Sequence, residues 1–519
     1  MTAEIACLAD TVRVHGARQP DAAAIVYDGR TTAYGALDRA SSQAANALIA
    51  DGVQPQRRIA HLDKSSDLFF ELLFGAAKAN AVMVSVNWRL APPEVAQIVN
   101  DAEAEMLFVG AEFFPVIEKI RGELKTVRKI VALDGGHSDW EPFAAWRDRQ
   151  PPTDPRLPIA PTDTAIQFYT SGTTGLPKGA EIINRNFTAM MPLWTREWLL
   201  APGVPNLVCL PMFHIGGAGW AVAGLYSGAT NHVMREFIPA QILETVQRER
   251  LQVLLLVPAM ILFLVQAPRI RETDLSSLRL IVYGAAPIPA ELLKQAIAIF
   301  PCGFQQVYGL TETTGAITLL PPKDHDPNDA KKLLSCGYAQ EGVELRIGGD
   351  DGKDMPPGKV GEIAVRSLQV MGGYWKLPEA TARAVQGDWF FTGDAGYLDE
   401  AGYLYIYDRV KDMIVSGGEN IYPAEVESAL FGHPAVADVA VIGVPDERWG
   451  EAVKAVVVKK ADSELTPGAL IGWARERIAG YKLPKSVDFI DALPRNPTGK
   501  ILKRELRKAY WGERERQVN

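Results

Sequence analysis

Apolar positions in the first quarter of the chain follow two different spacings. Helical spacing predicts helices over Leu68–Ala79 and Pro93–Asp101, whereas the short apolar runs Val82–Val86 and Met106–Val109 are typical of buried strands. Because helices and buried strands alternate between residues 56 and 135, this region predicts βαβ units and a largely parallel sheet.

The same alternation returns further along the chain. A helical pattern over Gln241–Arg250 precedes the apolar run Val253–Val257, and the strand-like Leu278–Val282 precedes a helical pattern over Pro289–Ile299. The predicted fold class of the large N-terminal body is therefore α/β.

From about residue 336 the pattern changes to short alternating strands separated by glycine and proline turns. Val343–Ile347 and Gly361–Arg366 alternate apolar and polar residues around the turn Gly348–Gly352. We expect an attached small β-barrel-like subdomain over residues 336–407.

A polar run at Asp408–Asp412 then precedes a compact α+β pattern, with a helix over Pro423–Leu430 and a strand over Val436–Ile442. The predicted organisation is an N-terminal domain over residues 1–407 and a small, mobile C-terminal domain over residues 408–519.

Composition narrows the class of protein. The chain has 519 residues, 47% hydrophobic and 22% charged, with a net charge of −8. This is an ordinary globular composition, and the acidic balance argues against a nucleic-acid partner. Four scattered cysteines favour a reducing cytoplasm over a disulfide framework or a zinc site.

Membrane and secretion signals are not expected either. The longest apolar stretch, Val253–Val265, has 13 residues and contains Pro258, whereas a membrane span needs about 20. The N-terminus lacks a basic segment followed by an apolar one, so no secretory signal is predicted.

The strongest local motif is Thr170–Gly179, which follows the strand-like Ala165–Tyr169. Its glycines permit a tight turn, and its hydroxyls and lysine supply donors and positive charge to a polyphosphate. The spacing differs from a Walker A motif, and a flexible surface loop is the alternative. The candidate phosphate-binding residues are Thr170, Ser171, Gly172, Thr173, Thr174, Gly175 and Lys178.

A second cluster lies in Gln306–Gly315, which we expect to be rich in turns. Tyr308 could stack on a base, Thr311 could bind a phosphate, and Glu312 could hold Mg²⁺, which prefers carboxylate and phosphate oxygens. Alone, this cluster is a weak signal.

Two further clusters each have a structural alternative. Asp394, which ends Trp389–Asp394, is suited to accept both ribose hydroxyls but could equally cap a turn. Leu493–Lys500 fixes its loop with prolines and a glycine, although Lys500 could simply be solvated. His214 stands alone beside a glycine-rich apolar stretch and could be structural.

Several enzyme classes are argued against by missing motifs. The chain has no G-x-S-x-G nucleophile elbow, no H-E-x-x-H and no G-x-G-x-x-G. Serine hydrolases, zinc proteases and dinucleotide-binding dehydrogenases are therefore disfavoured.

Taken together, the clusters resemble the adenylate-forming superfamily of acyl-CoA synthetases, nonribosomal adenylation domains and luciferases. Matching segments run from Tyr169 to Lys500, and residues 31–34 and 84–89 also resemble the family. Within it, Ile414–Glu427 and Pro494–Lys500 are most similar to fatty-acyl and aryl-CoA ligases.

The resemblance implies that a carboxylate attacks MgATP to give acyl-AMP and pyrophosphate, after which coenzyme A displaces AMP. ATP, Mg²⁺ and coenzyme A are the implied cofactors and co-substrates. The implied catalytic residues are Lys500, Thr311, Glu312 and His214, with Glu312 on the metal and Lys500 bridging the reacting carboxylate and the α-phosphate.

The resemblance also implies the nucleotide contacts and a domain rotation. Besides the phosphate loop, the implied binding residues are Gly284, Ala285, Ala286, Pro287, Tyr308 and Gly309 around adenine, Asp394 and Arg409 on ribose, and Ser416, Gly417 and Gly418 at the pantetheine channel. Lys411 matches the hinge about which the C-terminal domain would turn between the half-reactions.

The implied acyl pocket contains Gly216, Gly217, Trp220 and Tyr283. The glycines would admit an extended chain, whereas Trp220 could close the floor and favour a shorter or aromatic acid. A fatty or other apolar acid is the first expectation and a benzoate- or cinnamate-type acid the second. A carrier-protein adenylation enzyme, a noncatalytic nucleotide-binding protein and a homodimeric assembly stay open.

Overall fold

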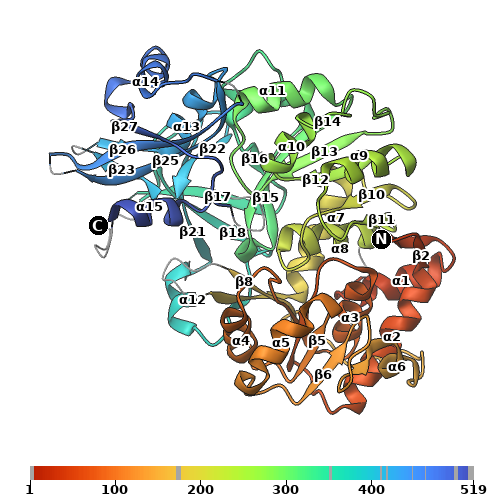
Figure 1. The fold of residues 1–519 in the computed structure, drawn as a ribbon. Helices are drawn as coiled ribbons and strands as arrows, with labels where there is room; N and C mark the ends of the chain where they lie inside the picture. The colour runs from red at the N-terminus through yellow and green to blue at the C-terminus, as the bar shows by residue number, and fades with distance from the viewer. Residues whose placement is uncertain are drawn as a thin grey trace.

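Helices and buried strands alternate along most of the chain, as the hydrophobic pattern predicts (Figure 1). The computed structural model describes residues 5–170, 177–349, 353–409, 412–416, 419–446, 448–461, 463–495 and 501–511. Parallel strands need long crossover connections, so helices lie between successive strands of the body.

The first sheet has nine strands within these described residues. Strands β14 to β1 are parallel, and β16, β15 and β2 are antiparallel strands at the two edges. In spatial order they are β16 (Tyr338–Ala339), β15 (Gly315–Leu320), β14 (Gly303–Leu310), β13 (Leu280–Gly284), β12 (Val253–Leu256), β10 (Pro205–Val208), β11 (Thr230–Val233), β1 (Ala23–Tyr27) and β2 (Arg30–Ala33).

The second sheet has eight strands in the described part of the chain. Its hairpin of β8 and β9, which β19 extends at the sheet edge, flanks the sequence of the predicted phosphate loop. In spatial order they are β19 (Gly373–Tyr374), β9 (Lys178–Ile183), β8 (Thr164–Thr170), β4 (Val82–Ser85), β3 (Arg58–Leu62), β5 (Met106–Val109), β6 (Lys129–Ala132) and β7 (Glu141–Pro142).

Helices pack on both sheets and between them, so the body has alternating helical and sheet layers. The outer layer on the first sheet is α9 (Pro239–Arg248), α10 (Pro258–Val265) and α11 (Ala290–Ile299). The outer layer on the second sheet is α4 (Pro92–Asp101) and α5 (Phe114–Ile120). The helices of the central apolar cluster are α1 (Asp10–Arg18), α2 (Tyr34–Ala50), α3 (Asp67–Lys78), α6 (Phe143–Asp148), α7 (Asn184–Glu197) and α8 (Ile215–Ser227).

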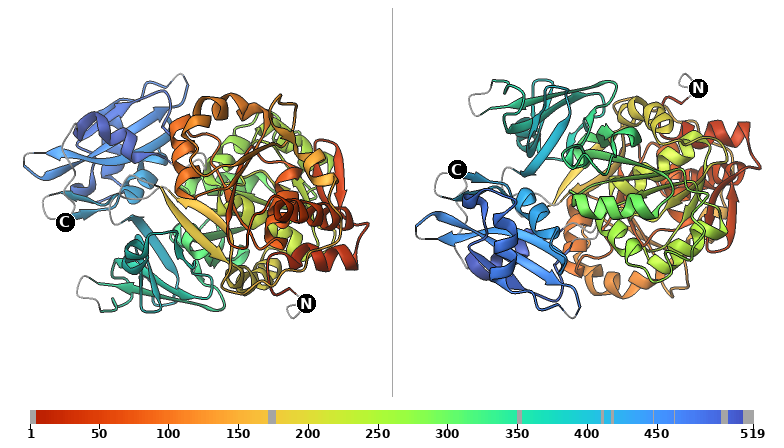
Figure 2. Two further views of the ribbon diagram at one scale, coloured as in Figure 1. Left: turned by 90° about the horizontal axis from the view of Figure 1, so that it is seen from below. Right: turned by 90° about the horizontal axis from the view of Figure 1, so that it is seen from above.

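A third, antiparallel sheet forms the β-rich subdomain, which lies beside the body and next to the C-terminal domain in both views of Figure 2. Its strands are β17 (Val343–Gly348), β18 (Gly361–Ser367), β20 (Val385–Gln386), β21 (Trp389–Leu398) and β22 (Leu404–Arg409), and α12 (Pro378–Ala384) precedes β20.

The C-terminal domain is an α+β unit with its own core, in which helices α13 and α14 pack on one face of a sheet and α15 on the other. Its elements are β23 (Ile414–Ser416), β24 (Glu419–Ile421), α13 (Pro423–Phe431), β25 (Val436–Asp446), β26 (Gly450–Lys459), α14 (Pro467–Arg475), β27 (Ser486–Phe489) and α15 (Lys503–Trp511).

The predicted fold class is confirmed, with an α/β body, a small β-rich subdomain and a separate C-terminal domain. One local expectation is wrong. Residues 306–310 are not a turn-rich segment but the end of β14, because backbone hydrogen bonds to β13 and β15 hold them extended. The boundary near residue 408 stays a prediction.

No described helix is long and apolar enough to cross a membrane. The four cysteines, all within the described residues, are free thiols.

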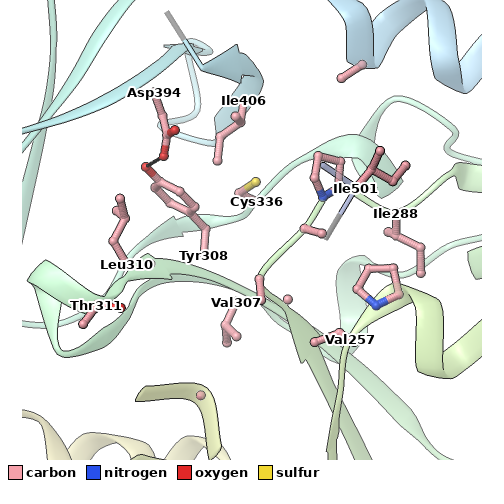
Figure 3. A pocket seen from close by; sticks show the side chains of 18 of the residues that line it. Val257, Ile288, Val307, Tyr308, Leu310, Thr311, Cys336, Asp394, Ile406 and Ile501 are labelled. Carbon is pink, nitrogen blue, oxygen red and sulfur yellow. Dashed lines mark hydrogen bonds between the residues drawn. The ribbon is translucent and has the colours of Figure 1, made fainter. Parts of the chain in front are cut away.

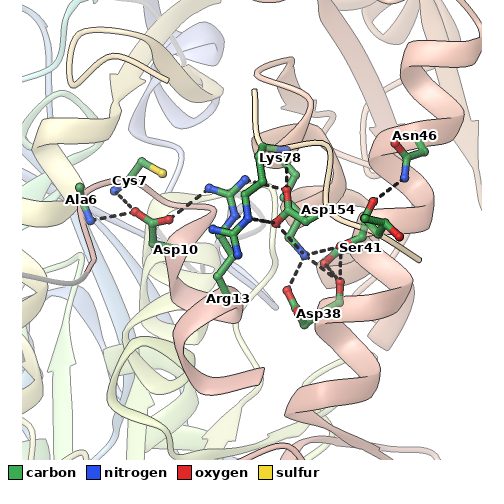
Figure 4. A network of polar contacts seen from close by, with 12 residues as sticks. Ala6, Cys7, Asp10, Arg13, Asp38, Ser41, Asn46, Lys78 and Asp154 are labelled. Carbon is green, nitrogen blue, oxygen red and sulfur yellow. Dashed lines mark hydrogen bonds and ion pairs between the residues drawn. The ribbon is translucent and has the colours of Figure 1, made fainter. Parts of the chain in front are cut away.

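A buried polar network ties three helices of the body together (Figure 4). The Lys78 side chain is fully buried, and its Nζ lies 2.5 Å from Oδ1 of Asp38 and 2.8 Å from Oγ of Ser42. Asp154, in the proline-rich loop after α6, lies 3.9 Å from the same Nζ and binds Arg13 of α1 at 2.7 Å. Burial lowers the pKa of Lys78, and the Asp38 carboxylate offsets that shift.

Lys78→Ala should destabilise the N-terminal body by about 3 kcal/mol, because it breaks a buried ion pair and leaves Asp38 without its cation, whereas Asp154 keeps Arg13. Lys294→Ala is the matched control, since Lys294 pairs with the exposed Glu291 on a helix surface and should contribute under about 0.5 kcal/mol. Urea unfolding followed by tryptophan fluorescence measures both. Equal midpoints for the two variants would contradict the importance of this network.

Candidate functional site

A cleft of about 1550 Å³ is lined by residues of the body, the β-rich subdomain and the C-terminal domain. The parallel strands β12 to β14 end at it, where loops after parallel strands commonly form binding sites. The sequence-predicted residues that line it are Thr170, Lys178, His214, Gly216, Gly217, Trp220, Gly284, Ala285, Ala286, Pro287, Tyr308, Gly309, Thr311, Glu312 and Asp394.

Tyr308 and Asp394, the two residues predicted to contact the nucleoside, are hydrogen-bonded to each other. Tyr308, on β14, donates a hydrogen bond of 2.8 Å to Oδ2 of Asp394, on β21, and Figure 3 shows both side chains in the cleft. Burial raises the pKa of Tyr308 far above its usual value, and the neighbouring Asp394 adds to that shift. The phenol therefore stays a donor at neutral pH and fixes the orientation of the carboxylate.

The Asp394 carboxylate comes from the third sheet, whereas the Tyr308 hydroxyl that binds it comes from the first sheet. Asp394 is 7% exposed, and its backbone pairs with that of Arg409 on β22. Thus Asp394 is neither a turn cap nor solvated, because it lies within a ten-residue strand. The side chain of Arg409 lies outside the described residues.

The polar end of the cleft gathers groups from three separate segments. Thr170 Oγ1, at the end of β8, lies 3.5 Å from Oε1 of Glu312, and the Tyr374 hydroxyl lies 2.9 Å from the same oxygen. Lys178, at the start of β9, places its Nζ 4.9 Å from the centre of the Tyr374 ring. Hydroxyls, a cation and a carboxylate are thus arranged around one space, as a metal-bound phosphate requires.

A magnesium ion fits this donor set only together with a phosphate. Among the described residues, no three His, Cys, Asp or Glu side chains are grouped to hold a metal by themselves. Mg²⁺ usually binds one or two carboxylates plus substrate phosphates, so Glu312 could hold a metal that arrives with ATP. The ion would neutralise phosphate charge when bound.

The predicted adenine segment begins where β13 ends. Gly284 closes β13, and a Cβ atom there would collide with the backbone oxygen of Val307 on the neighbouring strand. The next residue, Ala285, has φ of +67°, a left-handed conformation that costs an alanine about 1 kcal/mol. Such strain, directly at the cleft wall, supports a functional role for the turn.

Another part of the cleft wall is apolar and partly aromatic. The Trp198 ring centroid lies 4.3 Å from that of Trp194 and 5.0 Å from that of Trp220, with the rings tilted in both pairs. The Trp220 indole donates to the Leu207 carbonyl at 2.8 Å. The remaining described apolar lining includes Leu210, Phe213, Ile215, Leu255, Leu256, Val257, Pro258, Leu262, Ile288 and Leu292.

His214 is half-buried in the wall of the cleft. Burial lowers its pKa to about 4, and the positive charge of Arg89 contributes. Nε2 has no hydrogen-bond partner among the described residues. The imidazole is therefore neutral at physiological pH and suited to contact a substrate without adding charge.

The prediction for Tyr283 is wrong. Successive residues of β13 point to opposite faces of the sheet, and Tyr283 faces the outer helices, where its hydroxyl lies 3.0 Å from Nε2 of His325. It is fully buried and does not line the cleft. Ser416, on β23, also lies outside the cleft in this arrangement of the domains.

Nine sequence-predicted residues lie outside the described residues. They are Ser171, Gly172, Thr173, Thr174, Gly175, Lys411, Gly417, Gly418 and Lys500.

Tyr374 and Glu362 are cleft residues that the sequence analysis missed. Tyr374 follows the glycine pair Gly372–Gly373, a combination of turn residues and aromatic ring that could have marked it. Glu362 accepts a hydrogen bond from the Gly393 amide at 2.9 Å, beside Asp394, and burial raises its pKa.

The layered body and this cleft suit an enzyme that would bind a phosphate compound beside an apolar molecule. The model of the AMP-binding enzyme family matches residues 12–375, and that of the AMP-binding enzyme C-terminal domain matches residues 425–500. The chain therefore belongs to the AMP-binding enzyme family and is an AMP-forming ligase of carboxylic acids. Its relatives are named as ligases or synthases that act on carboxylic acids.

Relatives and solved structures agree over nearly the whole chain. A fatty acid–[acyl-carrier-protein] ligase, ScoC, from Streptomyces coeruleorubidus is 41% identical over 99% of both chains. A feruloyl-CoA synthase from Amycolatopsis sp is 39% identical over 95% of this chain and 96% of its own. The ATP-bound structure of MatB from Rhodopseudomonas palustris covers 98% of this chain and 100% of its own, with a TM-score of 0.89 and 30% identity.

Asp394→Ala should weaken ATP binding at least about tenfold, because a charged hydrogen-bond acceptor is lost from the expected ribose site. Asp388→Ala is the control, since Asp388 is exposed in the turn just before β21. Isothermal calorimetry with ATP compares them. Unchanged affinity in Asp394→Ala would remove Asp394 from the nucleotide site.

Proposed function

We propose that the chain activates an apolar carboxylic acid with MgATP and transfers the acyl group to coenzyme A. A carboxylate oxygen attacks the α-phosphorus, the bond to the pyrophosphate oxygen breaks, and acyl-AMP forms. The thiolate sulfur of coenzyme A then attacks the acyl carbon, and AMP leaves with the electron pair of the broken C–O bond.

The observation that carries the proposal is the shared cleft. Glu312, Lys178, the Tyr308–Asp394 pair and the tryptophan wall all line this one cleft. Charge accumulates on the phosphate during adenylation, so fixed donors and cations beside it stabilise the transition state most. Thr170 and Thr311 supply hydroxyl donors to the phosphates in this proposal.

The acid is proposed to be apolar because its expected wall carries no charge. Among the described residues between Trp194 and Leu262 that line the cleft, none is an Asp, Glu, Lys or Arg. An ionic group on the distal part of the acid would therefore be desolvated without a partner, at a cost of several kcal/mol. Fatty and aryl acids both satisfy this condition, and relatives carry both kinds of name.

Coenzyme A is the proposed acyl acceptor, and a carrier protein is the second candidate. Feruloyl-CoA synthase and indoleacetate–CoA ligase support the first, whereas the name of ScoC supports the second. Acid-dependent pyrophosphate release tests the first half-reaction. Thioester formation with coenzyme A alone, and with an acyl carrier protein alone, then separates the acceptors.

We propose that Lys500 acts only in adenylation, as its cation would bridge the carboxylate and the α-phosphate. Arg409 would contact the ribose, and Lys411 would serve as the hinge that withdraws Lys500. The same rotation would bring residues 416–418 to the thiol channel. If Lys500 acts in adenylation but not in thioester formation, its cation must lie on the domain that rotates between the two steps.

Lys500→Ala should lower acid-dependent pyrophosphate release by at least about a thousandfold, while thioester formation from supplied acyl-AMP changes little. Lys508→Ala, an exposed lysine of α15 paired with Glu505, is the control. Stopped-flow or radiometric assays of the two half-reactions provide the measurement. Equal losses in both steps would rule out this role.

Gly216→Val should narrow the range of acids. A Cβ atom at this position would meet only Leu210, 3.8 Å away, whereas one at Gly217 would collide with the Pro211 carbonyl. Gly216 is thus the position at which added volume enters the cleft. We expect kcat/KM for the longest accepted acid to fall about tenfold more than that for the shortest.

Gly472→Val is the matched control, because Gly472 is also a helical glycine with open space at its Cβ but lies on α14, outside the cleft. A uniform loss for all acids in Gly216→Val, similar to the control, would place the acyl chain elsewhere.

A further inference from the structure

Tyr374 contacts two groups of opposite charge in the cleft, Lys178 and Glu312. Its hydroxyl donates to Oε1 of Glu312 at 2.9 Å, and its ring faces the Lys178 ammonium at 4.9 Å from the centroid. Tyr374 is 9% exposed, so both contacts are made largely out of water.

Lys178 and Glu312 both contact Tyr374, but no ion pair joins them in the part of the chain that the structure describes. Opposite charges that share a neighbour in a partly buried cleft attract each other. A direct pair would occupy the lysine needed by the phosphates and the carboxylate needed by the metal. Something must therefore hold the two groups apart before the nucleotide arrives.

The backbone around Tyr374 is fixed tightly enough for that role. Tyr374 pairs with Ala180 on β9, two residues beyond Lys178, so the strand that carries the lysine also positions the ring. The Met371 amide donates to the Glu312 carbonyl at 2.8 Å, so the same segment also holds the acidic residue. The Tyr374 amide is itself anchored on Thr381 Oγ1 at 2.9 Å.

We propose that Tyr374 is a positioning residue that keeps Lys178 and Glu312 separate and charged, ready for MgATP. The ring attracts the ammonium without neutralising it, and the hydroxyl orients the carboxylate without removing its charge. This inference rests on the proposed function, since it takes Lys178 and Glu312 as phosphate and metal ligands.

Metal-free ATP binding tests the separation. In EDTA, Tyr374→Leu should bind ATP about tenfold more weakly by calorimetry, because Lys178 is then free to pair with Glu312 and loses its ring contact. Adding Glu312→Gln to Tyr374→Leu removes the competing charge. The double variant should bind ATP within about threefold of Glu312→Gln alone.

Magnesium titration tests the hydroxyl. Tyr374→Phe keeps the ring but loses the hydrogen bond, so the Mg²⁺ concentration for half-saturation of the ATP complex should rise about fivefold. Tyr403→Phe is the matched control, because Tyr403 donates to Asp324 at 2.7 Å outside the cleft. It should leave both binding constants unchanged.

Two results would overturn the inference. One is a double variant that binds ATP as weakly as Tyr374→Leu, which would mean that the loss is not due to Glu312. The other is an unchanged Mg²⁺ midpoint in Tyr374→Phe. Thermal unfolding of each variant checks that it is folded. Wild-type enzyme that binds ATP but releases no pyrophosphate with any acid would reject the proposed function and leave these binding tests intact.

Discussion

The polar half of the cleft depends on how closely neighbouring backbones approach each other. A Cβ atom at Gly309 would collide with the carbonyl oxygen of Gly315 across the β14–β15 pair, and one at Gly284 would collide with that of Val307. These contacts set the spacing of the strands that carry Tyr308 and, just beyond β14, Glu312. Because no side-chain rotation can change that spacing, these groups are already organised for the proposed nucleotide before it binds.

The charged side chains on this rigid frame are placed so that they can still interact with a ligand. A buried ion pair satisfies its partners and leaves them little affinity for anything else, whereas unpaired buried charges are costly. In this cleft, neutral tyrosine side chains contact the charged groups, so these groups are neither locked in ion pairs nor left without a hydrogen-bond partner. Tyr308 donates to Asp394 and Tyr374 donates to Glu312, so each carboxylate is oriented but still has acceptor capacity for a ligand.

Elements and motifs that depend on the spacing of nearby residues can be predicted from the sequence. Features that depend on a strand partner far along the chain cannot. Helix α3 and strand β4 follow directly from the apolar pattern, and the phosphate loop is marked by its own residues. Tyr283 was misplaced because a single motif does not say which face of β13 each residue takes. Tyr374 was missed because β19 has two residues and gains its meaning only by pairing with β9, almost 200 positions earlier. Residues 306–310 were also predicted incorrectly as a turn-rich segment, because the pairing with β13 and β15 that holds them extended is not visible in their own sequence.

Backbone contacts fix the shape of the polar part of the cleft wall, whereas side chains form its apolar part. This difference affects which acids the cleft can accept. Backbone approaches at Gly284 and Gly309 tolerate no added atom, so the wall proposed to hold the nucleotide cannot change without moving whole strands. The apolar end is made of side chains, such as Trp220 and Leu255, whose volume can change one residue at a time. Relatives named for fatty and for feruloyl substrates, each about 40% identical to this chain, can therefore share one scaffold. A family built in this way keeps its reaction and varies its acid.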